Sequence, residues 1–196
     1  MIGLRFRHAS TILYFILRWQ VTGTGELLRD IMRHWSSGVS VVSASHQGQR
    51  QGMTVSSFTS LSLSPPLILI ALARGKQTEV LAMQSGCLGV SILEADQQSL
   101  AARFADPASE GLDRFAGLET FTLATGSLLL TGCFAWLDCR IEETYQAGTH
   151  RLILARLADG GSQSAGRPLI YFDQSYGSFS AGGEPTSPKR YKGPDR

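Results

Sequence analysis

Hydrophobic and polar positions alternate in short runs over most of the chain, which predicts many strands and few helices. The continuous apolar run at 67–72 predicts a strand that is buried on both faces. Apolar residues recur at spacings of three and four from residue 25 to about 37, which predicts an amphipathic helix. The same spacing follows Asp96, which we expect to cap a further helix. Other expected strands are 39–45, 87–93, 132–143 and 151–157. This mainly β pattern favours an antiparallel Greek-key barrel with a few peripheral helices over a doubly wound sheet.

The segment Gly52–Pro66 combines two properties that ordinary strands and linkers do not share. Seven of its fifteen residues are Ser or Thr, yet large apolar residues are spread evenly among them. A solvated linker would not carry those apolar groups, and a packed strand would not carry so many hydroxyls without a polar partner. We therefore interpret the segment as a ligand-binding strand and loop. The alternative is a Ser/Thr-rich edge strand that binds nothing.

The segment Arg74–Thr78 precedes a short predicted helix and places a cation, a glycine and a hydroxyl at its start. Free N–H groups and the helix dipole both favour an anion at such a position. The segment is therefore a candidate phosphate site formed by Lys76, Gln77 and Thr78. A turn with a capping threonine and no ligand is the competing interpretation.

Composition narrows the range of functions. The 196 residues fit one domain, expected at 25–180, and the net charge of +2 comes from basic residues near both ends of the chain. Because a nucleic-acid-binding protein needs its basic surface on the folded part, that class is excluded. The spacing of the cysteines and histidines predicts neither a metal site nor a full set of disulfides. We expect three reduced thiols and a cytoplasmic protein.

The two ends of the chain are expected to differ from this domain. Residues 1–24 carry arginines before an apolar run of about nine residues, which is too short to span a bilayer. They form either a signal-peptide-like segment or, as we favour, an unprocessed extension or misassigned start. Residues 181–196 are rich in Gly, Pro and basic residues, and we expect a disordered tail there.

The residues Thr54–Pro66 resemble the flavin-binding signature of the short-chain flavin reductases, which are FMN-binding split barrels. The similarity extends with gaps from about residue 28 to residue 176. It includes the helix at 97–105, the loop that contains Arg114 and Phe115, and a closing strand at 168–172. The resemblance implies a split β-barrel. It also implies cofactor contacts at Thr54, Val55, Ser56, Ser57, Ser60, Ser62, Lys76, Gln77, Thr78, Ser91, Phe104 and Tyr176.

The chain departs from the family pattern at three places. Ser91 stands where family members usually have Asn, and the segment Asp173–Gly177 lacks the family's arginine. The family's Gly-Asp-His turn is here Gly148-Thr149-His150. The retained imidazole of His150 is the candidate catalytic group, because it can contact nicotinamide or flavin as a donor or a cation. An exposed turn histidine without a catalytic role is the alternative.

The function implied by the resemblance is an NAD(P)H:flavin oxidoreductase. Hydride would pass from NADH or NADPH to FMN or FAD, and the reduced flavin would supply a partner monooxygenase. Since the chain has no GxGxxG fingerprint, the nicotinamide nucleotide would not be held in the Rossmann way. The resemblance also implies a homodimer, and we expect no nucleic-acid or membrane partner. Two alternatives are a non-enzymatic flavin- or haem-binding split barrel and a split-barrel reductase acting on another acceptor such as ferric iron.

Overall fold

The computed structural model of the chain describes residues 23–109 and 111–179. The expectations for residues 1–22 and for the tail at 181–196 lie outside the described residues. The chain falls into two units, divided between Trp35 and Ser36. No helix within the described part of the chain is long and apolar enough to cross a membrane.

The first unit contains the helix α2, Gly25–Met32. Thr24 caps this helix, because its hydroxyl accepts a hydrogen bond from the Leu27 N–H at 3.1 Å. The helix ends at Met32, several residues earlier than the spacing of apolar positions predicted. None of its residues is buried.

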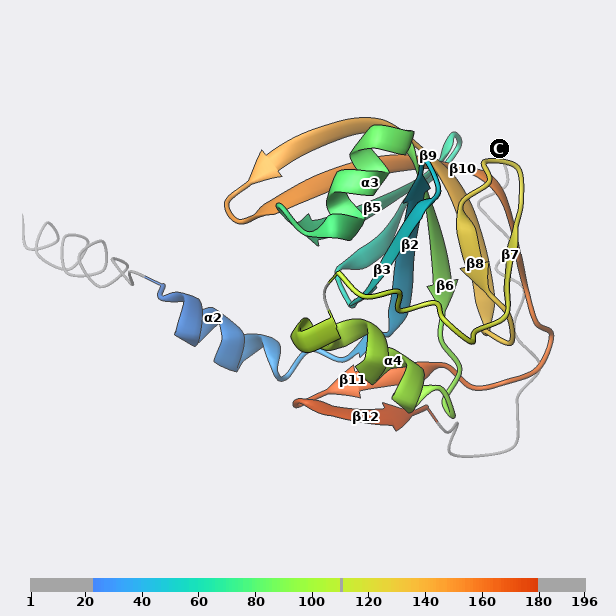
Figure 1. The fold of residues 1–196 in the computed structure, drawn as a ribbon. Coiled ribbons are helices and arrows are strands. Elements are labelled where there is room, and N and C mark those ends of the chain that lie inside the picture. Colours follow the sequence, from blue (N-terminus) through green and yellow to red (C-terminus); the bar gives the residue numbers. More distant parts are fainter. Residues whose placement is uncertain (1–22, 110, 180–196) are drawn as a thin grey trace, which may run out of the picture. The chain divides into compact units, whose positions relative to one another are not determined.

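The second unit is built on one antiparallel sheet of seven strands in the order β3-β2-β6-β9-β10-β5-β4 (Figure 1). Its strands are β2 Ser40–His46, β3 Gln49–Val55, β4 Phe58–Leu63, β5 Pro66–Ala73, β6 Cys87–Ile92, β9 Ala135–Ala147 and β10 His150–Ser162. The two edge strands, β3 and β4, follow each other in the chain but each pairs with a different neighbour, β2 and β5. The sheet is therefore a barrel that is split between β3 and β4, as the sequence predicted.

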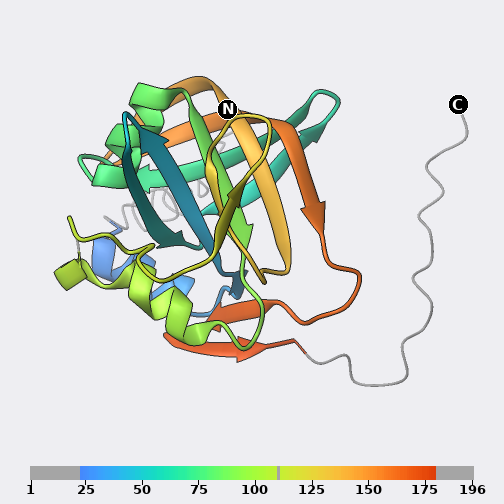
Figure 2. The ribbon, with the colours of Figure 1, turned by 45° about the vertical axis from the view of Figure 1, so that its right-hand side comes forward.

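Smaller elements cover this barrel. The strands β1 Ser37–Gly38, β11 Leu169–Phe172 and β12 Ser175–Ser178 form a second sheet, and β7 Thr120–Thr122 pairs with β8 Leu128–Leu130. The helices are α3 Gln77–Ser85 and α4 Gln98–Ala105, followed by a 3-10 turn at Pro107–Ser109. Figure 2 shows β11 and β12 at one end of the barrel beside α4.

The predicted cap of the second helix is wrong. The capping position of α4 is Gln97, not Asp96, and Gln97 makes no side-chain cap to the helix. Its side-chain oxygen instead accepts a hydrogen bond from the Glu94 N–H at 2.9 Å. Its amide nitrogen donates to the Gly132 carbonyl at 3.1 Å. Gln97 thus joins the segment before α4 to the segment before β9, which a carboxylate could not do.

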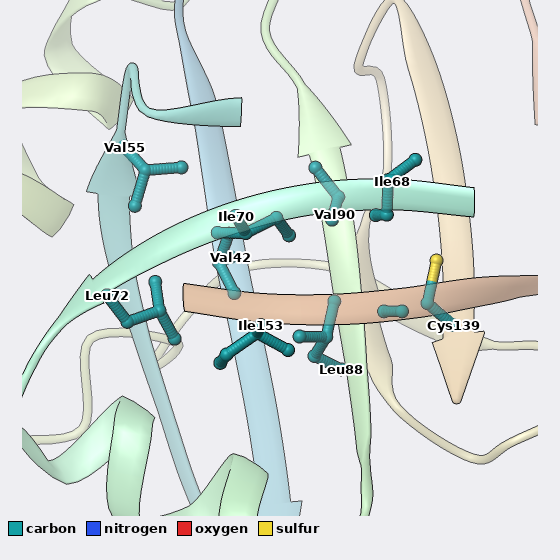
Figure 3. Close-up of a cluster of buried hydrophobic side chains, with 10 residues drawn as sticks. Val42, Val55, Ile68, Ile70, Leu72, Leu88, Val90, Cys139 and Ile153 are labelled. Atoms are coloured by element: carbon teal, nitrogen blue, oxygen red, sulfur yellow. The ribbon is translucent and has the colours of Figure 1, made fainter. Parts of the chain in front are cut away.

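The barrel core is filled from both halves of the curled sheet. Figure 3 shows Ile70 and Leu72 of β5 in one cluster with Val42 of β2 and Leu88 of β6, and all four are buried. Burial alternates along β5, so its other face is only partly buried. The expectation of a strand buried on both faces is therefore wrong, because an antiparallel barrel strand turns only one face to the core.

A second core cluster packs α4 against the barrel end. The rings of Phe104 and Phe115 meet edge to face, with centroids 4.9 Å apart. A Cβ atom added at Gly52 of β3 would lie 2.8 Å from Phe104 Cε1 and 2.9 Å from Phe115 Cζ. Gly52 is thus required by this aromatic pair, which lies directly against the backbone of β3.

All three cysteines are free, as predicted. Burial raises the pKa of Cys133 to about 11 and that of Cys139 to about 12, while Cys87 is partly exposed. The two buried thiols stay protonated at neutral pH and form thiolates only as the pH rises toward those values. We expect a disulfide reagent at pH 8 to label Cys87 first and to reach the other two only in denaturant. Rapid labelling of three thiols in the native protein would contradict this.

Candidate active site

The Ser/Thr-rich segment forms the end of β3, the two-residue connection Ser56–Ser57, and the edge strand β4. Three of its hydroxyls donate to protein carbonyls. Thr54 donates to Ala101 of α4 at 2.7 Å, Ser57 to Ala71 of β5 at 2.7 Å, and Thr59 to the adjacent Ser60 at 3.3 Å. Val55 is buried in the barrel core. Part of the segment is therefore held against α4, β5 and the core.

The remaining hydroxyls of the segment lie on the surface. Ser56 and Ser60 are exposed, Ser62 is half-buried, and a register shift against β5 lies between Ser60 and Ser62. An exposed edge strand offers unpaired main-chain N–H and C=O groups next to these hydroxyls. The outer side of β4 therefore presents hydrogen-bonding groups to a planar ligand.

A cavity of about 170 Å³ at the start of α3, here called the helix-end cavity, brings five of the predicted site residues together. The predicted residues that line it are Thr54, Lys76, Gln77, Thr78 and Phe104. Gln51, Met53 and Arg114 also contribute to its wall. Residues from β3, α3 and α4 that are far apart in sequence thus meet at one place.

The geometry of the start of α3 suits an anion. Lys76 occupies the capping position in an extended conformation and makes no side-chain cap. The N–H groups of the first helical turn have no partners within the helix, and the positive end of the helix dipole lies there. The Thr78 side chain is buried in this first turn. A phosphate at this position can accept hydrogen bonds from backbone N–H groups with Lys76 nearby.

Arg114 is a wall residue that the sequence interpretation did not select. Its side chain is buried, and among the described residues it donates to the Gly52 and Asp106 carbonyls at 2.9 and 2.6 Å and to the Ser109 hydroxyl at 2.9 Å. These oxygens are uncharged, so the guanidinium keeps a positive potential at the cavity wall. The available signal was that the family resemblance includes the loop that contains Arg114.

The loop before α3 is tied to the turn that carries His150. Glu79, buried in α3, accepts a hydrogen bond from the Gly75 N–H at 3.1 Å and forms an ion pair with Arg151 of β10. The Arg74 N–H donates to the Thr149 carbonyl at 3.0 Å. The sequence carried no signal for this link, because it joins residues about 70 positions apart.

His150 begins β10 and is exposed. In the sheet it lies opposite Ala73 on one side and Ala147 on the other. Its Nδ1 is 3.0 Å from the Thr149 hydroxyl, which can donate to it or accept from it according to the tautomer. The described residues that line the helix-end cavity do not include His150. Its imidazole therefore stands near the candidate phosphate loop but outside the cavity.

Two other residues predicted to contact the cofactor, Ser91 and Tyr176, instead make contacts within the protein. The buried Ser91 hydroxyl accepts a hydrogen bond from the Leu130 N–H at 3.0 Å, so this side chain holds β8 against β6. Tyr176 packs in the second core cluster, with its ring centroid 5.3 Å from that of Tyr171. Burial raises the pKa of Tyr176. Among the described residues, no cluster of three or more His, Cys, Asp or Glu side chains could hold a metal ion.

An antiparallel split barrel with a candidate anion site at the start of α3 and a hydroxyl-bearing edge strand is typical of the FMN-binding split barrels. Residues 32–180 match the family model described as "Flavin reductase like domain". The chain therefore belongs to the flavin reductase family.

Similar proteins span most of this chain. Over 151 residues it is 36% identical to the actinorhodin polyketide dimerase of Streptomyces coelicolor, covering 76% of this chain and 84% of that protein. It is 34% identical to the NADH-dependent flavin reductase StyB of Pseudomonas fluorescens, covering 76% and 86%. The solved structure of the Streptomyces globisporus NADH:FAD oxidoreductase SgcE6, in complex with NAD and FAD fragments, superposes with a TM-score of 0.75. It is 29% identical and covers 81% of this chain and 94% of that one.

Proposed function

We propose that this protein is an NAD(P)H:flavin oxidoreductase that supplies reduced flavin to a partner monooxygenase. The observation that carries the proposal is the helix-end cavity, where Lys76, Gln77 and Thr78 meet Thr54 and Phe104. Family membership supports the same chemistry, in which a bound flavin accepts hydride from the nicotinamide. One similar protein is named a polyketide dimerase and not a flavin reductase. The final electron acceptor of this chain therefore needs its own test.

The residues have distinct roles in this proposal. A cavity of about 170 Å³ is smaller than the roughly 300–1,000 Å³ of complete small-molecule sites, so it holds the phosphate end of the flavin. Lys76, Thr78 and the start of α3 bind that phosphate, and Arg114 adds positive potential. The exposed hydroxyls of Ser56 and Ser60 and the half-buried hydroxyl of Ser62 lie where the ring system would emerge. The protein orients the two reacting rings, which accounts for a site built mostly of hydroxyls and amides.

We further propose that the protein acts as a homodimer in the cytoplasm. The edge strand β4 exposes Leu61 and Leu63, the latter 88% exposed, beside the flavin-facing hydroxyls. A second copy that covers this edge would bury both leucines and enclose the ring that the helix-end cavity leaves outside. Three reduced thiols fit a reducing compartment.

Steady-state NADH oxidation with added FMN tests the activity. We expect oxidation that requires both NADH and flavin and that continues for many turnovers in air. Ferric iron supplied without flavin, and haem supplied as a ligand, test the alternatives of a ferric reductase and a haem-binding protein. Retention of FMN in equilibrium dialysis without NADH oxidation would identify a flavin-binding protein that is not an enzyme.

Replacing His150 by alanine is expected to slow flavin reduction about tenfold, which corresponds to about 1.4 kcal/mol of lost positioning. Flavin affinity should stay within about twofold, because His150 stands outside the cavity that binds the phosphate. Stopped-flow reduction of bound flavin across a range of NADH concentrations measures the effect. Wild-type kinetics in this variant would make His150 an ordinary turn residue.

A further inference from the structure

A second cavity of about 480 Å³ adjoins the helix-end cavity. Gln51 and Gln77 line both, so the two spaces are neighbours along one surface. The second space, here called the hairpin cavity, lies between the tip of the β2–β3 hairpin and the segment that contains Asp113. Its volume falls within the range of about 300–1,000 Å³ that is typical of small-molecule sites.

The wall of the hairpin cavity holds a guanidinium in one fixed orientation. Arg50 donates to both carboxylate oxygens of Asp113, from Nη2 at 2.7 Å and from Nε at 3.1 Å. The guanidinium carbon lies 5.8 Å from the centroid of the buried Phe115 ring. The Arg50 side chain is nevertheless 39% exposed, so part of its planar surface remains accessible from the cavity. A guanidinium restrained in this way is a stacking surface for an aromatic base.

The charges and amides of the wall favour a neutral base over a second anion. Asp113 offsets the positive charge of Arg50, whereas the helix-end cavity next to it has Lys76 and Arg114 in its wall. Gln49, Gln51 and Gln77 contribute side-chain amides, each of which can donate and accept hydrogen bonds. The edge of an adenine ring presents donors and acceptors of the same kind.

From this geometry we propose that the hairpin cavity binds the adenosine part of a dinucleotide whose phosphates lie at the start of α3. The inference rests on the proposed function, because that function places a flavin phosphate in the helix-end cavity. The same chemistry is present in two molecules, FAD and NADH. In either case Arg50 stacks on the adenine, and Gln77 stands between the phosphate site and the base site.

The test compares ligands with and without the adenosine part. Arg50→Lys keeps the positive charge that faces Asp113 but removes the planar surface. Arg156→Lys is the matched control, because Arg156 is also an exposed arginine paired with a carboxylate, that of Glu142 on β9. For each protein the dissociation constants of FMN and FAD are measured, together with KM for NADH and for reduced nicotinamide mononucleotide. Gln49→Leu, which removes an amide of the wall at similar size, is the second variant.

We expect Arg50→Lys to weaken one adenosine-containing ligand about fivefold while its counterpart without adenosine changes less than about twofold. A rise in the FAD constant alone assigns the cavity to the flavin, and a rise in KM for NADH alone assigns it to the hydride donor. Gln49→Leu should weaken binding of the same ligand. Arg156→Lys should change neither the FAD constant nor KM for NADH. If the ratio of the FAD and FMN constants and the ratio of the two KM values are unchanged in the Arg50 and Gln49 variants while a flavin still binds, the subsite is wrong and the proposed function stands. If the wild-type protein binds neither FMN nor FAD, the proposed function fails and the subsite fails with it.

Discussion

Replacing Gly52 by valine is expected to destabilise the protein by about 3 kcal/mol, the upper part of the range for overpacked cores. The added Cβ would lie within 3 Å of both Phe104 and Phe115, and neither ring can move away because both are fully buried. The Gly52 carbonyl also accepts a hydrogen bond from Arg114, so a shift of the β3 backbone would disturb the cavity wall. Urea unfolding should show a lower midpoint with an unchanged slope.

Gly161→Val is the matched control for this substitution. Gly161 also lies in a strand, β10, but a Cβ there would meet no described atom within 4 Å. We expect its stability to stay within about 0.5 kcal/mol of the wild type, because exposed substitutions away from special features usually do. Equal unfolding midpoints for the two variants would show that the aromatic pair relaxes and that Gly52 is not needed for packing.

Replacing Lys76 by alanine is expected to weaken FMN binding about tenfold or more while riboflavin binding changes less than about twofold. The two ligands share the ring system and differ in the phosphate, which is the group that we place at the start of α3. Thr78→Val, which removes only a hydroxyl from the first turn, should act in the same direction with a smaller effect. Fluorescence titration with both ligands measures the ratio. Equal losses for FMN and riboflavin would show that Lys76 and Thr78 support the structure and do not bind the phosphate.

The sequence was sufficient for the class of fold and for the elements that carry the candidate site residues. The Ser/Thr-rich segment lies at the split of the barrel, and the residues Lys76–Thr78 begin the helix that was expected to follow them. Both predictions depended on local properties, namely residue type and spacing. The strands β5, β6 and β10 were also found where alternation or apolar runs predicted them, with differences of a few residues at their ends.

What the sequence could not provide depends on contacts between distant residues. Gly52 begins the segment that was interpreted as ligand-binding, but the structure fills the space beside it with Phe104 and Phe115. Ser91 was a cofactor candidate by its position in the family pattern, yet its hydroxyl is occupied by the Leu130 N–H. Arg114 was not selected as a site residue, because a charged side chain is seldom buried. Its burial depends on carbonyls of β3 and of the segment after α4, which no local pattern reveals.

Glu79 contacts neither of the places where we expect ligands, but it ties them together. Through Gly75 it holds the loop that begins α3, and through Arg151 it holds the strand that begins with His150. A ligand that pushes the loop outward must therefore also pull on the turn, because both are attached to one buried carboxylate. In the function proposed above, the protein thus sets the spacing between the flavin phosphate at the start of α3 and His150 before either substrate binds. Inserting a residue into the β9–β10 turn would alter that spacing without changing any residue of the helix-end cavity.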